Sequence, residues 1–172
     1  IKCENQSFKC HRTILASAAD YFDAMFDGTF KESKEEEIFL ADVSAEVFGG
    51  VVQFIYTGHV TITASNICGL LHHASEFFEL TGIRDLCVHF VEQNRMNAEN
   101  TFNVLEFANK IDDQVLIERL CRDINENFTT FSRAPQFLEI SIDSFNIIIN
   151  HSLSSRRNEE SLLSGIVRWI TW

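Results

Sequence analysis

Patterns typical of β-strands are confined to the first 62 residues, and this confinement restricts the possible folds more than any other feature. Two short runs, Ile1–Cys3 and Ser7–Cys10, flank a polar turn and predict a hairpin. Further short strands are expected at Ile38–Leu40 and around His59–Ile62. Beyond Arg95 the apolar residues follow a helical period alone. The sequence therefore predicts an α+β amino-terminal part and an all-helical remainder.

Apolar residues at helical spacing predict a series of helices, each with a buried stripe. The first stripe runs from Ile14 to Phe26, and Gly28 ends that helix. Ser44 is placed to cap the next helix, which Thr57-Gly58 ends. The residues expected to face inward in the first four helices are Ile14, Leu15, Ala18, Phe22, Met25 and Phe26; Phe48, Val51, Val52, Ile55 and Tyr56; Ile67, Leu70, Leu71, Ala74, Phe77 and Phe78; and Ile83, Leu86, Cys87, Phe90 and Val91.

The second half of the chain reads as paired helices. Asn97 or Asn100 can cap one helix and Asp112 or Asp113 can cap a second, and the two should form a helical hairpin. Pro135 is tolerated in a first helical turn because its missing N–H would be unpaired there anyway. A last helix should carry the inward stripe Leu162, Leu163, Ile166, Val167, Trp169 and Ile170.

The charge and hydropathy of the chain argue against two classes of partner. The formal net charge is −11, and the pairs Arg156-Arg157 and His72-His73 are isolated, without interleaved aromatic residues. Such a surface repels a phosphate backbone. No apolar run approaches the roughly 18 residues that span a bilayer, and no signal-peptide pattern opens the chain. We therefore expect neither nucleic acid nor membrane among the partners.

The cysteines do not suggest a disulfide framework. Five of them, at positions 3, 10, 68, 87 and 121, are scattered along the chain, and no C-x-x-C pair occurs that would make a zinc or redox site. Cys87 and Cys121 fall on apolar faces of predicted helices, where cysteine acts as a small hydrophobe. A reducing compartment, the cytosol or the nucleus, fits this usage best.

The stretch NQSFKCHRTILASAADYFDAMF first suggests catalysis or a metal site, because His11, Cys3 and Cys10 lie close together. Its aromatic residues and methionine, however, fit a core stripe. His72 and His73 are adjacent on a predicted helix, so their side chains point in different directions. No G-x-S-x-G, H-E-x-x-H or glycine-rich phosphate motif occurs. We expect no catalytic residue, no metal ligand and no cofactor.

The loop DGTFKESKEEE is the place where function is expected to be concentrated. Phe30 is an apolar residue in a charged loop without an inward period, and exposed aromatic side chains commonly anchor interfaces. The alternative is a loop residue that folds back on the core. The run Lys34–Glu37 is expected to be a solvated face.

Residues 1–95 resemble a BTB (POZ) domain in successive blocks, FKCHRTILAS with DYFDAMF, IFLADVSAEVFGGVVQFIYTGHV and LHHASEFFELTGIRDLCVHFV. Residues 96–172, from MNAENTFNVLEFANKIDDQVLIERLCRDINENF to FLEISIDSFNIIINHSLSSRRNEESLLSGIVRWITW, resemble the amino-terminal part of the BACK domain that follows BTB in kelch-type adaptors of cullin-3 ubiquitin ligases. The resemblance implies an α+β BTB domain of short strands with a helical cluster, then an all-α BACK domain of paired helices. It also implies that the first strand and the amino-terminal helix of the BTB domain precede Ile1.

By this resemblance the His-Arg pair is structural, with His11 in the core and Arg12 facing an acidic position on the preceding strand. BTB domains pair through their amino-terminal helix and the helix that carries Ile14, Ser17 and Ala18 here. The resemblance therefore implies a homodimer in which this face meets its own copy.

Cullin-3-binding BTB proteins carry a hydrophobic-x-Glu motif, and Phe30, Lys31 and Glu32 match it in spacing and position. The resemblance thus implies a non-catalytic adaptor that bridges a cullin-3 ubiquitin ligase to a substrate held by a carboxy-terminal domain beyond Trp172. One alternative is a BTB–BACK oligomerisation scaffold, cytoskeletal or transcriptional, that recruits no cullin. A second alternative is an enzyme that uses Cys and His.

Overall fold

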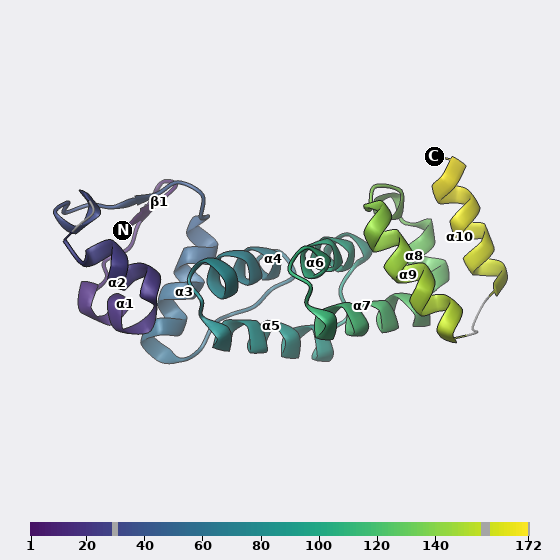
Figure 1. The fold of residues 1–172 in the computed structure, drawn as a ribbon, viewed down its shortest axis with the longest axis horizontal. Helices are drawn as coiled ribbons and strands as arrows, with labels where there is room; N and C mark the ends of the chain where they lie inside the picture. Colours follow the sequence, from purple (N-terminus) through teal and green to yellow (C-terminus); the bar gives the residue numbers. More distant parts are fainter. Residues whose placement is uncertain (29–30, 156–158, 172) are drawn as a thin grey trace. The chain divides into compact units, whose positions relative to one another are not determined.

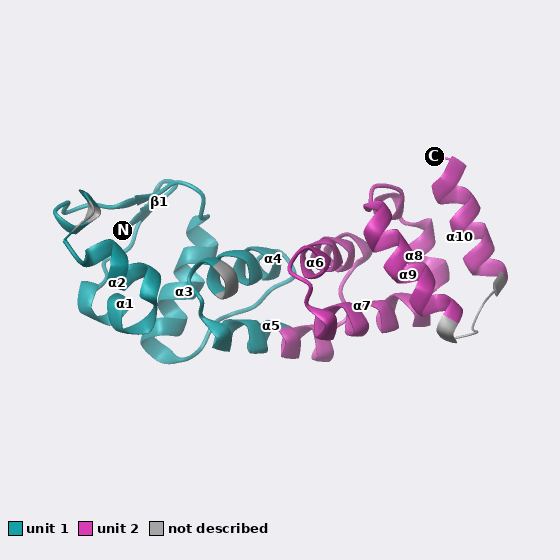
Figure 2. Ribbon diagram, viewed as in Figure 1, with its two compact units in different colours: residues 1–87 teal, residues 88–172 magenta. Residues whose placement is uncertain are grey.

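A computed structural model describes residues 1–28, 31–155 and 159–171 (Figure 1). The chain divides into two compact units, residues 1–87 and residues 88–172 (Figure 2). A small three-stranded sheet lies in the first unit, and the secondary structure described for the second is helical. The predicted order, an α+β part followed by a helical part, is confirmed.

The sheet consists of three two-residue strands. Strands β1 (Lys2–Cys3) and β2 (Gln6–Ser7) form the predicted antiparallel hairpin, and β3 (Phe39–Leu40) runs parallel to β1 on its other side. The strand expected around residues 59–62 is absent from the described structure. There Asn66 donates from Nδ2 to the Thr61 carbonyl at 3.0 Å and accepts from the Thr63 N–H at 2.8 Å. These local bonds occupy backbone groups that a strand would need.

The helix predicted from Ile14 to Phe26 is in fact two helices, α1 (Arg12–Ala18) and α2 (Asp20–Phe26). The break falls at Ala19, whose extended conformation (φ −151°, ψ 130°) turns the chain. Ala19 is buried, and Phe22 after it is fully buried. The break therefore redirects α2 so that its apolar residues enter the core.

Helix α3 (Ala45–Thr57) has the predicted ends. The Ser44 hydroxyl accepts from the Val47 N–H at 3.3 Å, and Gly58 adopts the left-handed conformation (φ 72°) that ends the helix. Val47, Phe48 and Val51 are buried. Tyr56 was expected to face inward but is 40% exposed. That expectation is wrong because its hydroxyl bonds to His11 near the surface.

An unusual helix follows α4 (Ile67–Gly69). Segment η2 (Leu70–Phe77) is a π-helix, in which Phe78 N–H donates to the His73 carbonyl five residues earlier at 2.9 Å. The wider turn changes which residues face the core. Phe78 is fully buried, whereas Phe77, expected to face inward, is 48% exposed. Helix α5 (Thr81–Gln93) comes next.

The second unit is built from consecutive packed helices. The Asn97 side chain caps α6 (Ala98–Lys110), and the Asp113 side chain caps α7 (Gln114–Glu126). Of the predicted candidates, Asn97 and Asp113 are therefore confirmed as caps, and Asn100 and Asp112 are not. These helices pack together as the predicted hairpin, and α7 also contacts α9. The remaining elements are α8 (Phe128–Arg133), η3 (Pro135–Leu138), α9 (Ile142–Ser155) and α10 (Glu159–Thr171).

Only one side of α10 is buried. Leu162 is 6% exposed, and Gly165 lies close to the Phe128 ring of α8. Leu163, Val167 and Ile170, which were expected to face inward, are 64%, 52% and 68% exposed. That expectation is wrong because α8 and η3 pack on a single side of α10.

A substitution at Gly69 can test whether α4 and α3 approach closely. An ideal Cβ on Gly69 would lie 2.5 Å from Cγ2 of Val47, a stiff and buried side chain. Gly69→Ala should therefore lower the free energy of unfolding by about 1–3 kcal/mol in urea denaturation. Added to Val47→Ala, which removes the clashing methyl, the same change should be neutral or stabilising by up to about 1 kcal/mol. An equal loss in both backgrounds would contradict this steric explanation.

Candidate functional site

The loop after α2 was predicted to carry function, and the structure describes part of it. Gly28 follows α2 with a φ of 82°, which favours glycine. Lys31–Ser33 form a single 3-10 turn, η1, that the Lys34 N–H closes on the Lys31 carbonyl at 3.0 Å. Lys31 is exposed. Phe30 lies outside the described residues, as does the side chain of Glu32, so their predicted roles stay predictions.

Arg12, in the first turn of α1, binds the main chain of this loop. Its guanidinium donates through Nη1 to the Ser33 carbonyl at 2.5 Å and through Nη2 to the Glu35 carbonyl. The guanidinium carbon also lies 5.4 Å from the centre of the Phe26 ring, a cation–π distance. One side chain thus joins α1, the end of α2 and the loop.

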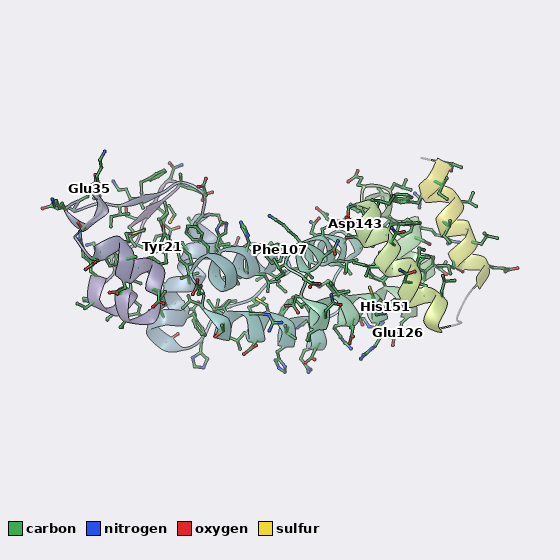
Figure 3. All side chains as sticks on the ribbon, in the orientation of Figure 1. Tyr21, Glu35, Phe107, Glu126, Asp143 and His151 are labelled. Atoms are coloured by element: carbon green, nitrogen blue, oxygen red, sulfur yellow. The ribbon has the colours of Figure 1, made fainter. Side chains whose placement is uncertain are left out.

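The far end of the loop is tied to the sheet. Lys2 Nζ forms an ion pair with Glu37 Oε2 at 2.6 Å, and the Lys2 N–H donates to the Ile38 carbonyl at 2.7 Å. Lys34 through Glu37 are all exposed, as expected of a solvated face. Figure 3 labels Glu35 at the edge of the first unit, on the side away from α3. The loop is therefore exposed along Lys34–Glu37 and anchored near both of its ends.

His11 is not the core histidine that the resemblance implied. The residue is exposed, and its ring Nδ1 lies 2.8 Å from the Tyr56 hydroxyl, which also accepts from the His11 N–H at 2.8 Å. Because these bonds join the start of α1 to the last turn of α3, His11 acts as a tether at the surface. His11 thus has a structural role, but the prediction that it lies in the core is wrong.

The residues predicted for self-association share one side of α1. Ile14 is 36% exposed, Ser17 and Ala18 are also exposed, and Leu15 is buried on the other side. The i, i+3, i+4 spacing of the first three places them on one face. The structure therefore presents this face to solvent, where a second copy could reach it. The expectation that Ile14 and Ala18 face inward is wrong, because Leu15 and Ala19 are the residues that α1 and its end bury.

Sequence reasoning missed a partly exposed aromatic cluster on α2 and η2, in which Phe77 is exposed and Tyr21 is half-buried. The rings of Tyr21 and Phe77 lie 4.6 Å apart, and Tyr21 also contacts Phe78 edge-on at 5.2 Å (Figure 3 labels Tyr21). His73 lies 6.5 Å from Phe77. A helical period of 3.6 could not reveal this cluster, because the π-helix turns Phe77 outward. An aromatic surface of this kind is suited to contact another protein.

The thiols are poorly suited to nucleophilic chemistry. Burial raises the pKa of Cys3 to about 11 and that of Cys87 and Cys121 to about 12. Burial also raises the pKa of Cys10 and Cys68. At neutral pH these groups are thiols, whereas the thiolate is the reactive form. In the part of the chain that the structure describes, no cluster of three or more His, Cys, Asp or Glu could hold a metal ion.

The second unit contains a pocket of about 320 Å³ between the start of α6 and the start of α8. Its lining combines apolar side chains with one cation and one anion, Arg95 and Asp123. A volume of this size suits a single side chain or a small molecule. Because its charges have opposite signs, the lining does not favour ligands of one charge. The lining residues are Arg95, Met96, Asn97, Ala98, Thr101, Asp123, Asn127, Thr130 and Phe131.

Comparison with known families gives two matches that follow each other along the chain. Residues 1–95 match the BTB/POZ domain, and residues 101–172 match the BACK domain, described as "BTB And C-terminal Kelch". Among the helices that the structure describes, none is long and apolar enough to cross a membrane.

Individual relatives carry kelch names. The chain is 32% identical to Kelch-like protein 21 of Danio rerio over 97% of its own length and 27% of the relative's. It is 30% identical to Kelch repeat and BTB domain-containing protein 8 of Danio rerio, over 97% and 28% of the two lengths. It is also 30% identical to Kelch-like protein 30 of Mus musculus, over 96% and 28%. The chain therefore spans little more than a quarter of the curated relatives it matches.

His73 provides a pH test of the η2 region. Burial, and then the neighbouring His72, lower the pKa of His73, while Asp42 acts in the opposite direction. The unfolded chain, with the ordinary value of 6.5, therefore binds a proton more readily than the folded protein does. Stability should fall as the pH drops below about 6.5, because protonation favours the unfolded state.

The measurement is the urea midpoint at pH 7.0 and at pH 5.5. The midpoint should drop in the parent protein and drop less in His73→Gln. The control His89→Gln, at an exposed position on α5, should keep the parent's drop. The same drop in His73→Gln as in the parent would contradict the role given to burial.

Proposed function

Since this chain belongs to the BTB–BACK proteins of the kelch-like type, a family of adaptors rather than catalysts, we propose that it bridges a substrate to a cullin-3 ubiquitin ligase. The BTB part pairs with a second copy and binds the cullin. The substrate is held by a domain beyond Trp172, and the setting is the cytosol or the nucleus. Ubiquitin transfer itself is carried out by the ligase partners.

The observation that carries this proposal is the anchored loop after α2. Arg12 and Lys2 fix the segments that follow the motif Phe30-Lys31-Glu32, and both Lys31 and Lys34–Glu37 are exposed. An interface anchor needs this combination of exposure and fixed position, because ordering a free loop on binding opposes association. The loop thus supports a binding role for the motif, which the family resemblance suggested.

The motif residues have different parts in the proposal. Phe30 enters an apolar pocket on the cullin, and burial of a Phe side chain stabilises by roughly 1.5–3 kcal/mol before interface costs. The Glu32 carboxylate accepts hydrogen bonds that fix the loop in its binding shape, each worth on the order of 1 kcal/mol net. Lys31 lies between them and contacts the rim of the interface.

The runner-up is an oligomerising scaffold that recruits no cullin. The exposed face of α1 supports self-association in either case, so the state of assembly does not separate the two. Direct titration with an amino-terminal cullin-3 fragment does. The enzyme alternative is disfavoured, since burial raises the pKa of all five cysteine thiols.

Ala18 tests self-association. In an isologous dimer through α1, an aspartate at position 18 would meet its own copy or lie close to it. Ala18→Asp should therefore weaken the dimer of the full-length protein at least about tenfold, as like charges at an interface do. Gln53→Asp, which adds the same charge at an exposed position on α3, should leave the dimer unchanged. Sedimentation equilibrium at micromolar concentration measures both, and a parent protein that stays monomeric would remove the dimer from the proposal.

Phe30 tests the cullin anchor. Phe30→Ala should weaken binding of the cullin-3 fragment by about 2 kcal/mol, roughly thirtyfold, in isothermal titration, as expected of an interface hot spot. Its thermal midpoint should stay close to that of the parent, since a loop anchor contributes little to the core.

Two other phenylalanines serve as controls for that test. Phe39 is 61% exposed but lies outside the motif, so Phe39→Ala should bind the cullin fragment as the parent does. Phe22 is fully buried, so Phe22→Ala should lose roughly 3–5 kcal/mol of stability. If Phe30→Ala bound as tightly as the parent, or unfolded like Phe22→Ala, the oligomerising scaffold would become the better account.

A further inference from the structure

The contacts of Arg12 point to a role beyond stability: we infer that its guanidinium is a positioning group that holds the loop after α2 ready for the cullin. This inference rests on the proposed function. We use the name Arg12 clamp for the two hydrogen bonds to the Ser33 and Glu35 carbonyls together with the cation–π contact with Phe26. The clamp lies directly after Lys31–Glu32, the described end of the motif.

The geometry of the clamp makes use of the whole guanidinium. Two nitrogens, Nη1 and Nη2, donate to two different main-chain carbonyls that are two residues apart. The carbon of the same group lies over the Phe26 ring, 5.4 Å from its centre. Because main-chain atoms are held, the clamp restricts the path of the loop whatever side chains the loop carries.

Lysine could not make this set of contacts. An ammonium group is a single point of charge, whereas a guanidinium presents a planar fork of donors and can stack at the same time. The clamp also connects two different helices. Arg12 begins α1, and Phe26 is the last residue of α2. The loop is thus fastened to both helices that precede it.

Fastening the loop should act on the rate of association. If only a fraction of molecules hold the loop in its binding shape, the apparent affinity falls by that fraction. Loss of the clamp lowers the fraction before binding, so the association rate falls while the contacts in the complex remain. Loss of Phe30 removes a contact in the complex, so it raises the dissociation rate. The two changes are therefore distinguishable.

The first measurement asks whether the clamp holds the loop. Glu35, Glu36 and Glu37 are exposed, so a glutamate-specific protease can report on the loop under native conditions. Cleavage after these residues, identified by mass spectrometry, should be about tenfold faster in Arg12→Ala than in the parent. Arg12→Lys should lie between the two. Lys9→Ala, which removes a nearby exposed positive charge, should match the parent.

The second measurement follows binding kinetics with the cullin-3 fragment. Arg12→Ala should lower the association rate constant roughly tenfold and leave the dissociation rate constant within about twofold. Arg12→Lys should recover part of the association rate. If Arg12→Ala does not fold, Phe26→Leu removes the aromatic ring from the clamp, keeps an apolar side chain beside Phe22, and should produce the same two changes to a smaller extent.

Three outcomes would overturn the inference. Unchanged cleavage in a folded Arg12→Ala would show that the loop does not depend on the clamp. Faster cleavage with unchanged association would show that the clamp has no part in binding. A parent protein that does not bind the cullin fragment would overturn the proposed function and the binding role of Arg12 with it, while the cleavage rates would still decide whether the clamp exists.

Discussion

The first unit depends on the burial of one ring, that of Phe22. Its side chain is fully buried, stacks on Phe78 at 4.9 Å and meets Phe48 at 6.4 Å in an edge arrangement. Phe22 belongs to α2, Phe48 to α3, and Phe78 directly follows η2, so one aromatic cluster joins segments far apart in the sequence. Burial of such rings contributes most of the stabilisation in a small core. The break at Ala19 directs Phe22 into this cluster, and the wide turn of η2 does the same for Phe78.

The features that the sequence predicted are those set by local chemistry. Ser44, Asn97 and Asp113 cap their helices because a short polar side chain satisfies free N–H groups at a helix start wherever it occurs. Gly58 ends α3 because few other residues adopt its backbone conformation. The hairpin and the buried stripe of α7 follow from the same kind of local pattern.

The features that sequence reasoning missed depend on partners distant in the chain. A helical period cannot show which of two apolar sides is covered, so Leu163 and Ile170 on α10 were assigned to the core although α8 packs on the other side. His11 was assigned to the core by family resemblance, but its bonds to Tyr56 draw it to the surface. The motif Phe30-Lys31-Glu32 was proposed from the sequence and stays a prediction, whereas the attachment of Arg12 to the loop could not be foreseen, since carbonyl acceptors carry no side-chain signature.

The π-helix of η2 determines how the aromatic surface of Phe77 and Tyr21 could be gained or lost. A π-helix bonds each N–H to a carbonyl five residues back instead of four, so it holds one residue more than the α-helix that would replace it. Deletion of a single residue between Leu70 and Phe77 would allow ordinary α-helical pairing, and the remaining side chains of the segment would then be distributed differently between the buried and the exposed side. The outward position of Phe77 is thus a matter of chain length as much as of residue type. A one-residue insertion or deletion, without any change of composition, would be enough to create or remove the aromatic surface that it forms with Tyr21.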